Sequence, residues 1–400
     1  MTSAMPIRSW PVTSRRALVA SLRTGSPVPA EPSLATVVAG CDPGQLADLA
    51  ISEGLAGPVF NRLDGLLPPE PRSRLATEAR RDTVRHLAYL DLLRKFGAAL
   101  EEAQVTWVAL KGPVLAELSY PGVPRSYADL DLMVHPEQLR EAVSALEGAG
   151  AVVAETDWSQ ITESAKGQLS MSVHGLPIID LHWHLVYLRS ARERWAIPTE
   201  DLLERRQPAR LQDVDAWSLD PADFLAHLAL HASFGAAQQL RRLLDISHTI
   251  ANRPPVWDLL VQRCQAWQVE LPVSVMLNKA RQTLGADVPT EVVHALAVRK
   301  TNRLLVGLLS EWVPAGPMPG NRSVKNGLTR SLRDGVMATA GQFAGETRRA
   351  IAQLLHLGEF GAVETSHSHS AGLCSGLESY LRMVERADRY GHLEPARSRA

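Results

Sequence analysis

From Tyr127 to Val134 the 400-residue sequence alternates between apolar and polar residues, and this pattern narrows the possible folds more than any other segment. In a β-strand, residues two positions apart lie on the same face of the sheet. The apolar members would then face a core, and Asp129 and Asp131 would lie side by side on the other face, with Cα atoms about 6–7 Å apart. Two carboxylates at that distance repel each other unless a cation lies between them. The pattern therefore predicts a strand that carries a candidate cation site.

Two acids at this spacing are weak evidence by themselves, because Asp213 and Asp215 repeat the spacing in a segment that we expect to be a turn. The context of the first pair is more informative. A buried strand is predicted from Val105 to Leu110, and it ends in Lys111-Gly-Pro113 shortly before the pair. Hard carboxylate oxygens favour Mg²⁺, which usually takes one or two carboxylates together with substrate phosphates.

A third acid belongs to the same predicted unit. Gln168 to His174 and Ile178 to Val186 read as two strands of a hairpin. Asp180, His182 and His184 would share the polar face of the second strand. An acid on a half-buried strand is unusual unless it is paired or binds a ligand, so Asp180 is the third candidate metal ligand.

The rest of the sequence predicts helices around a small mixed sheet, which is an α+β fold. Residues 1–35 are expected to be irregular, helices are expected from about Pro43 to Leu63 and from Ser73 to Glu102, and the chain after Tyr187 is expected to be mostly helical. Later helices are expected at about 221–233, 238–250, 292–312, 331–357 and 375–390. We expect four units: an N-terminal helical region (1–104), a mixed-sheet core (105–190), a helical domain that closes the cleft (191–313) and a helical C-terminal extension (314–400).

Charge and cysteine content restrict the class of protein. The 42 Lys and Arg residues nearly balance the 43 Asp and Glu residues, so a protein that coats nucleic acid is disfavoured. The 3 cysteines are scattered, which argues against a disulfide framework or a zinc knuckle and fits the cytoplasm best. No apolar run reaches the ~18 residues that a membrane helix needs, so no membrane association is expected.

An ordered set of short motifs resembles a known group of proteins. The motifs are Leu110-Lys-Gly112, Tyr120-Pro, Arg125, Asp129-Leu-Asp131-Leu and Asp180-Leu-His182-Trp183, with His227-Leu-Ala-Leu-His231 and Arg241-Arg-Leu-Leu-Asp245 downstream. In this order they resemble the bacterial uncharacterised nucleotidyltransferase family of the DNA polymerase beta-like superfamily. The resemblance covers roughly residues 45–255.

The resemblance implies an enzyme that moves a nucleoside monophosphate from an NTP, expected to be ATP, to a hydroxyl acceptor on a small molecule, a peptide or a protein. Natural-product biosynthesis is one setting that it suggests. It implies two Mg²⁺ ions and the following residues: metal-binding and catalytic Asp129, Asp131 and Asp180; nucleotide-binding Lys111, Gly112, Arg125 and Ser126; accessory His182 and His184. Asp180 would also orient the acceptor hydroxyl or accept its proton.

One departure from the superfamily pattern favours a second hypothesis. Gly112 is followed by Pro113, which has no N–H to offer a phosphate, although proline is tolerated at the first position of a helix. The alternative function is therefore a catalytically weak module that binds a nucleotide or a partner on the same fold.

Several single-residue interpretations stay open at this level. Arg125 binds phosphate or pairs with Asp129, and Lys111 binds phosphate or is a solvated charge. His182 and His184 assist the site or make structural hydrogen bonds. His227 and His231, one helical turn apart, pack a helix or contact the core more readily than they bind zinc, and Arg241 and Asp245 form a local ion pair.

Overall fold

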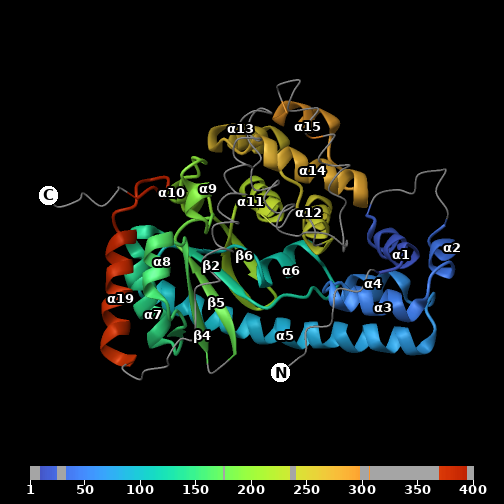
Figure 1. The fold of residues 1–400 in the computed structure, drawn as a ribbon, viewed down its shortest axis with the longest axis horizontal. Coiled ribbons are helices and arrows are strands. Elements are labelled where there is room, and N and C mark those ends of the chain that lie inside the picture. Colours follow the sequence, from blue (N-terminus) through green and yellow to red (C-terminus); the bar gives the residue numbers. More distant parts are fainter. Residues whose placement is uncertain are drawn as a thin grey trace, which may run out of the picture.

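The computed structural model describes residues 10–24, 33–173, 176–234, 240–297, 306 and 369–393. Its centre is a seven-stranded mixed sheet with the strand order β3-β4-β5-β2-β1-β7-β6 (Figure 1). The strands are β1 (Trp107–Ala109), β2 (Leu130–Val134), β3 (Val152–Val153), β4 (Gln168–Val173), β5 (Leu176–His182), β6 (Gln207–Leu211) and β7 (Val214–Ser218). Helices flank this sheet, so the predicted α+β class is confirmed.

The helices form an N-terminal group, a group around the sheet and a C-terminal group. The first comprises α1 (Val12–Leu22), α2 (Leu34–Ala39), α3 (Pro43–Ser52), α4 (Ala56–Leu63) and α5 (Pro69–Glu102). The second comprises α6 (Pro113–Ser119), the 3₁₀ helix η1 (Pro136–Gln138), α7 (Leu139–Gly148), α8 (Trp158–Ser164), α9 (Arg189–Arg192) and α10 (Thr199–Glu204). The third comprises α11 (Pro221–Phe234), α12 (Leu240–Asn252), α13 (Trp257–Trp267), α14 (Glu270–Leu284), α15 (Thr290–Leu296) and α19 (His369–Val384).

One expectation about the helical regions needs correction, and two others lie wholly or mostly outside the described residues. Residues 1–35 were expected to be irregular, but α1 forms and buries Ala17, Leu18 and Leu22 against α3 and α4. Tertiary packing of this kind stabilises short helices whose own sequence pattern is weak. Most of the helix expected at 292–312 and the whole of that expected at 331–357 fall outside the described part of the chain.

Strand β2 lies between β1, to which it is antiparallel, and β5, to which it is parallel. Its register with β5 sets Asp131 opposite Asp180. All five residues of β2 are buried, because helices cover both faces of the sheet at this point. The acidic face of the strand therefore lies inside the protein rather than at its surface.

The hairpin of β6 and β7 was missed by the sequence analysis, which expected no strand after Val186. Ser218 of β7 pairs with Ala109 of β1 in parallel, so the sheet continues across the boundary expected at residue 190. Pro208 and exposed polar residues dilute the alternation of this edge hairpin, which is typical of edge strands. Asp215 lies on β7 and pairs with Arg210 at 2.7 Å on the surface, away from any acid cluster.

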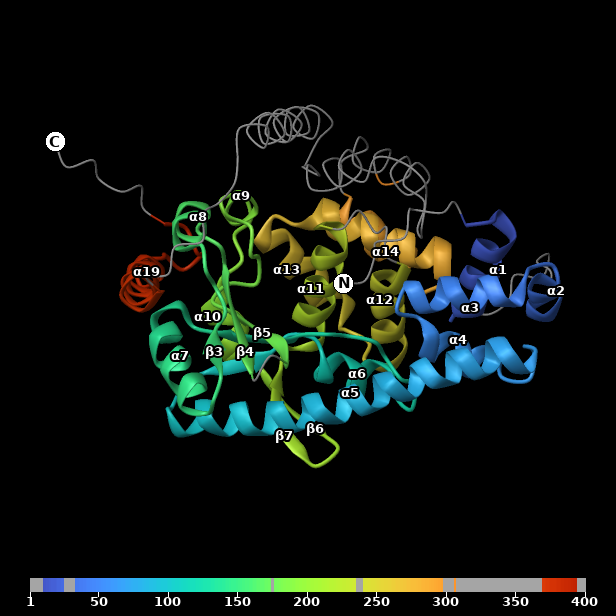
Figure 2. The same cartoon turned by 60° about the horizontal axis from the view of Figure 1, so that its bottom comes forward.

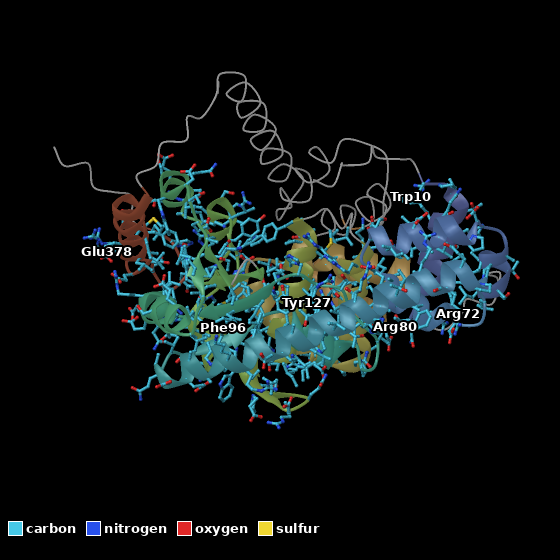
Figure 3. The ribbon with its side chains drawn as sticks, turned by 90° about the horizontal axis from the view of Figure 1, so that it is seen from below. Trp10, Arg72, Arg80, Phe96, Tyr127 and Glu378 are labelled. Atoms are coloured by element: carbon cyan, nitrogen blue, oxygen red, sulfur yellow. The ribbon has the colours of Figure 1, made fainter. Side chains whose placement is uncertain are left out.

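A long helix supports the sheet from one side and a helical group covers the other. Helix α5 packs against α6, α7 and β7; it runs along the bottom of the molecule in Figure 1, and in Figure 2 the β6–β7 hairpin extends below it. Figure 3 shows it from below, running from Arg72 past Arg80 to Phe96. Gly97 allows close contact with β1, since a Cβ there would lie 2.9 Å from the Trp107 ring.

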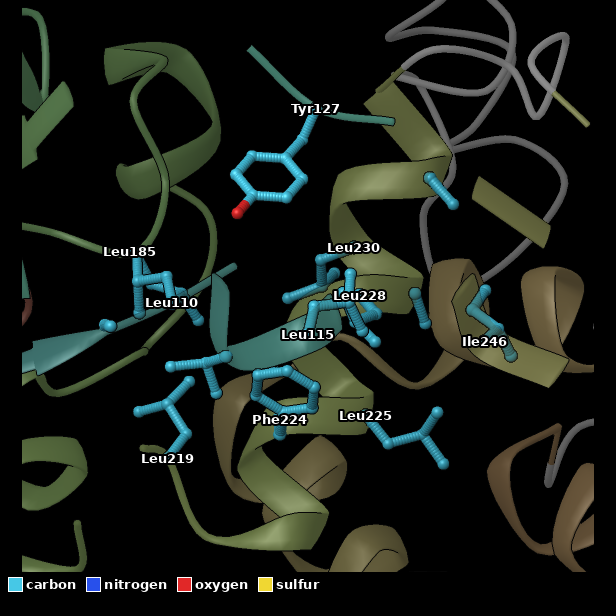
Figure 4. Close-up of a cluster of buried hydrophobic side chains, with 14 of the residues drawn as sticks. Leu110, Leu115, Tyr127, Leu185, Leu219, Phe224, Leu225, Leu228, Leu230 and Ile246 are labelled. Carbon is cyan, nitrogen blue, oxygen red and sulfur yellow. The ribbon is translucent and has the colours of Figure 1, made fainter. Parts of the chain in front are cut away.

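The helical group α11–α14 shares a single hydrophobic core with the sheet. Figure 4 shows Leu110 at the end of β1 and Leu115 of α6 near Phe224 and Leu228 of α11 and Ile246 of α12. The helices are thus fixed over the ends of β1, β2 and β5, and they form the second wall of the pocket described next. No helix in the described part of the chain combines the length and apolar composition of a membrane span.

Candidate active site

The candidate site is a pocket between the ends of β2 and β5 and helix α11. Acidic and basic side chains line it on the side of the sheet, and histidines, apolar residues and an arginine line it on the side of the helices. The lining residues are Lys111, Asp129, Asp131, Lys166, Gln168, Asp180, His182, Leu185, Val186, Tyr187, His227, Leu230, His231, Phe234 and Arg242. Three of these side chains form a tight group. The ligand atoms of Asp131, Asp180 and His182 all lie within 4.8 Å of one another.

The centre of the group is Asp131, which is 1% exposed. Its Oδ1 accepts hydrogen bonds from Lys111 Nζ and His182 Nε2, each at 3.1 Å. Burial alone would raise the pKa of Asp131, but the Lys111 ammonium and the His182 ring outweigh it and hold that pKa well below its ordinary value. Asp131 is therefore a buried, charged carboxylate.

The second oxygen of Asp131 has no hydrogen-bond partner among the described residues. Buried charged oxygens are normally paired or bound to a metal, so an unpartnered one marks a place for a positive group. One carboxylate oxygen of Asp131 and one of Asp180 lie within 4.8 Å of each other, which fits a shared hard cation with carboxylate ligands. The donor set therefore fits Mg²⁺.

Asp180 completes the pair from the neighbouring strand. It is half-buried, and its Oδ1 accepts a hydrogen bond from Ser170 Oγ of β4 at 3.2 Å. The expectation that Asp180 lies beside Asp131 is confirmed by the register of β2 and β5. Its role stays a prediction.

Asp129 lines the same pocket without joining the tight group. Strand β2 begins at Leu130, one residue later, so the strand geometry that would set Asp129 beside Asp131 does not extend to it. Burial, and next the negative charge of Asp131, raise the pKa of Asp129 above its ordinary value. A cation in the pocket would relieve both effects, which keeps Asp129 as a candidate ligand.

A family model described as uncharacterised nucleotidyltransferase matches residues 40–285, which is more than half of the chain. The chain belongs to this family. The resemblance drawn from the sequence motifs is thereby confirmed. The match contains every strand of the sheet, and α19 lies beyond it. No curated protein matches the chain.

The turn after β1 explains how this nucleotidyltransferase accommodates proline after glycine. Gly112 has φ 58 and ψ -120, a conformation that disfavours any side chain, and a Cβ there would lie 3.0 Å from the Asp129 carbonyl oxygen. Pro113 follows as the first residue of α6 and is buried. The glycine therefore lets the turn approach the acidic loop, and the proline begins the helix.

Arg125 and Ser126 lie away from the pocket of the nucleotidyltransferase. Arg125 donates two hydrogen bonds to Asp245 of α12, at 2.7 and 2.9 Å, in place of the expected contact with Asp129. Asp245 also accepts from Tyr120 Oη at 2.7 Å, so its pairing is with the core rather than with Arg241. Two nitrogens of the Arg125 guanidinium are thus used inside the protein, and Nη1 is buried without a hydrogen-bond partner among the described residues. Its expected nucleotide contact, and that of Ser126, stay untested predictions without support from this geometry.

The two histidines that were expected to assist the site have different kinds of hydrogen-bond partner in the structure. His182 bonds to Asp131, whereas the hydrogen bonds of His184 to described residues go to backbone: its Nδ1 accepts from Val186 N at 2.9 Å and its Nε2 donates to Ile197 O at 3.0 Å. Burial, followed by the charge of Arg192, lowers the pKa of His184 to about 3. His184 therefore has the structural arrangement that was one of its two expected roles.

Helix α11 supplies pocket residues that the sequence analysis expected either to pack the helix or to contact the core. His227 is 4% exposed, and its Nε2 has no partner among the described residues. Burial, and then the nearby Lys111 charge, keep the pKa of His227 and of His231 well below the ordinary value, so both rings are neutral. Their contact with the core side was one of the expected alternatives, and no local pattern in α11 indicated a pocket.

Lys166 is a charged pocket residue to which the sequence analysis assigned no role. It precedes β4, and its Nζ contacts Glu155 Oε1 at 2.9 Å and Ser170 Oγ at 3.5 Å. A lone lysine before a strand gives no sequence signal, because only the pairing of β4 with β5 brings it beside Asp180.

Proposed function

We propose that this nucleotidyltransferase uses Mg²⁺ to transfer a nucleoside monophosphate from an NTP, expected to be ATP, to a hydroxyl on a small molecule, a peptide or a protein. The observation that carries the proposal is the unpartnered Oδ2 of the buried, charged Asp131 beside Asp180. A buried charge in this state needs a cation, and the family supplies the reaction class.

Asp131 and Asp180 would hold the metal through carboxylate oxygens, with Asp129 as a further ligand. The chemistry that Mg²⁺ would supply there is stabilisation of the negative charge on the attacking and leaving oxygens of the displacement. His182 is better described as an orienting residue, because its Nε2 already donates to Asp131 and Mg²⁺ prefers oxygen ligands.

The cationic residues of the pocket have a separate role in the proposal. Lys111 contacts Asp131 on one side of the cluster, and Lys166 lies near Asp180 on the other. Both ammonium groups are placed to attract the phosphate charges of a nucleotide. Positioning and charge of this kind account for most of the catalysis that phosphoryl and nucleotidyl transfer need from a protein.

Asp180 is the residue that we expect to orient the acceptor hydroxyl. It is less buried than Asp131, and its Oδ1 accepts a hydrogen bond from the neutral Ser170 hydroxyl rather than from a cation. One of its oxygens is thus available to accept a proton from an acceptor that reaches the pocket. The scattered cysteines lead us to expect this reaction in the cytoplasm.

The test is pyrophosphate release from each NTP in the presence of Mg²⁺ and a panel of small-molecule, peptide and protein acceptors. The wild-type protein should release pyrophosphate and add the mass of one nucleoside monophosphate to its acceptor. Asp131→Asn should lower the rate by more than the roughly 10–100-fold that changes around metal ligands typically cause. Nucleotide binding without turnover across the panel would instead support the binding-module alternative.

A further inference from the structure

The C-terminal segment 369–393 lies outside the matched family region and packs on the side of the core that carries β4 (Figure 1). Helix α19 contacts α7 and α8, and Arg140 of α7 binds Glu378 and Glu385 at 2.6 and 2.8 Å. Gly376 lies against the Trp158 side chain so closely that a Cβ there would lie 2.4 Å from Trp158 Cγ. The segment is therefore docked through specific contacts.

One side chain of α19 reaches the backbone behind the pocket. Tyr380 is fully buried, its hydroxyl donates to the carbonyl oxygen of Lys166 at 2.5 Å, and it accepts from Trp183 Nε1 at 2.7 Å. Trp183 directly follows His182 of the acidic cluster. Tyr380 thus links the backbone of Lys166 to the end of β5.

The C-terminal end of the segment is also linked by hydrogen bonds, through Arg192, to the region around Lys166 and the end of β5. His392 Nε2 donates to the carbonyl oxygen of Arg192 at 3.0 Å. The guanidinium of Arg192 in turn donates to the carbonyl oxygens of Ala165, Val186 and Tyr187. Val186 and Tyr187 line the pocket, and Ala165 directly precedes the pocket residue Lys166.

The side chain of Lys166 carries the positive charge of this stretch. It lines the pocket, its Nζ lies 3.5 Å from Ser170 Oγ, and that hydroxyl donates to Asp180. Glu155 fixes the direction of the ammonium group at 2.9 Å. A phosphate held near the acid cluster would lie within reach of this ammonium group.

We propose that Tyr380 is a positioning residue: its hydrogen bond to the backbone of Lys166 holds this lysine where it binds the phosphates of the nucleotide. Segment 369–393 thereby contributes to the active site. This inference rests on the proposed function, because it takes a nucleotide as the ligand. It assigns a role to a part of the chain, segment 369–393, that the family match does not include.

The test uses the full chain with Mg²⁺ and a non-hydrolysable ATP analogue, titrated by calorimetry. Tyr380→Phe removes one hydroxyl and should weaken binding of the analogue roughly 3- to 10-fold, as the loss of one hydrogen bond does. The carbonyl of Lys166 keeps the Trp183 N–H at 3.0 Å as a donor, so the variant should fold, as circular dichroism would check. Tyr390→Phe, a hydroxyl deletion in the same segment but outside the pocket, is the matched control and should bind like the wild type.

Two further readouts separate positioning from general destabilisation. Lys166→Gln should weaken binding of the analogue at least as much, and Tyr380→Phe added to Lys166→Gln should cause no further loss. Adenosine, which lacks phosphates, should bind equally to wild type and both single variants. Unchanged analogue binding in Tyr380→Phe, additive losses in the double variant, or equal weakening of adenosine would overturn the inference while leaving the proposed function standing. Failure of the wild type to bind any NTP would overturn the proposed function and this inference with it.

Discussion

At the scale of single residues, the chemistry of the site depends on which side chains have partners. Asp131 uses one oxygen for Lys111 and His182, and the other has no hydrogen-bond partner in the described part of the chain. Its position on a strand could be predicted from the alternation of apolar and polar residues around it. The partners could not, because Lys111 and His182 come from separate segments that meet only when β1, β2 and β5 pair.

Arg125 likewise has a partner that could not be predicted from the local sequence. The sequence offered Asp129 as a nearby partner, whereas the structure pairs Arg125 with Asp245, 120 residues away. Local spacing favours close partners on the chain, but a buried guanidinium binds the carboxylate that the tertiary fold brings to it.

His227 gives the prediction at this scale. Its buried Nε2 has no partner among the described residues, so His227→Leu removes an unsatisfied polar group and should leave the free energy of unfolding unchanged or raise it. If the ring contacts substrate, the same change should lower kcat/KM by roughly 10-fold or more. Urea unfolding and steady-state kinetics check the two effects. Destabilisation with unchanged kinetics would show that His227 only packs the helix.

At the scale of elements, the strongly periodic helices and the buried apolar strands could be predicted from the sequence. The strands at the edge of the sheet could not. Helices α5, α6 and α11 and strands β1, β2, β4 and β5 lie near their expected positions. The β6–β7 hairpin was missed because Pro208 and exposed polar residues obscure its alternation, and its strands are recognised only by pairing with β1. Helix α1 was missed because its packing, rather than its pattern, stabilises it.

The docking of α12 on the core gives the prediction at this scale. Asp245→Asn would leave Arg125 buried without its counter-charge and should lower the free energy of unfolding by about 3–5 kcal/mol. The matched control is Asp91→Asn, which breaks an ion pair with Arg94 whose acid is 78% exposed, and it should change stability by less than about 1 kcal/mol. Chemical denaturation of both variants measures the difference, and similar values for the two would contradict the role assigned to Asp245.

The pH dependence of this pair has a defined sign. Burial alone would raise the pKa of Asp245, but Arg125 outweighs it and lowers that pKa below the ordinary value of 3.8. The stability that the pair contributes is therefore fully present above pH 3.8 and is lost as the pH falls through the lowered pKa. In Asp245→Asn this acid-induced component should be absent from a stability profile between neutral and acidic pH.

At the scale of the whole molecule, the pocket is assembled from segments far apart in sequence. The sheet supplies the acids, α11 supplies the opposite wall, and α19 reaches Lys166 across 214 residues. The α+β class, the proximity of Asp131 and Asp180 and the family were predictable from the sequence, since motifs in order carry that information. The position of α19 was not predictable, because no sequence pattern indicates which surface a terminal helix will cover.

The most direct test is a crystal structure of the full chain with Mn²⁺ in place of Mg²⁺ and a non-hydrolysable ATP analogue. The anomalous signal of Mn²⁺ should lie between Asp131 Oδ2 and an oxygen of Asp180, at about 2.0–2.2 Å from each, with phosphate oxygens completing the shell. A metal bound elsewhere, or Asp131 Oδ2 hydrogen-bonded to a protein group with no ion beside it, would contradict the proposed site.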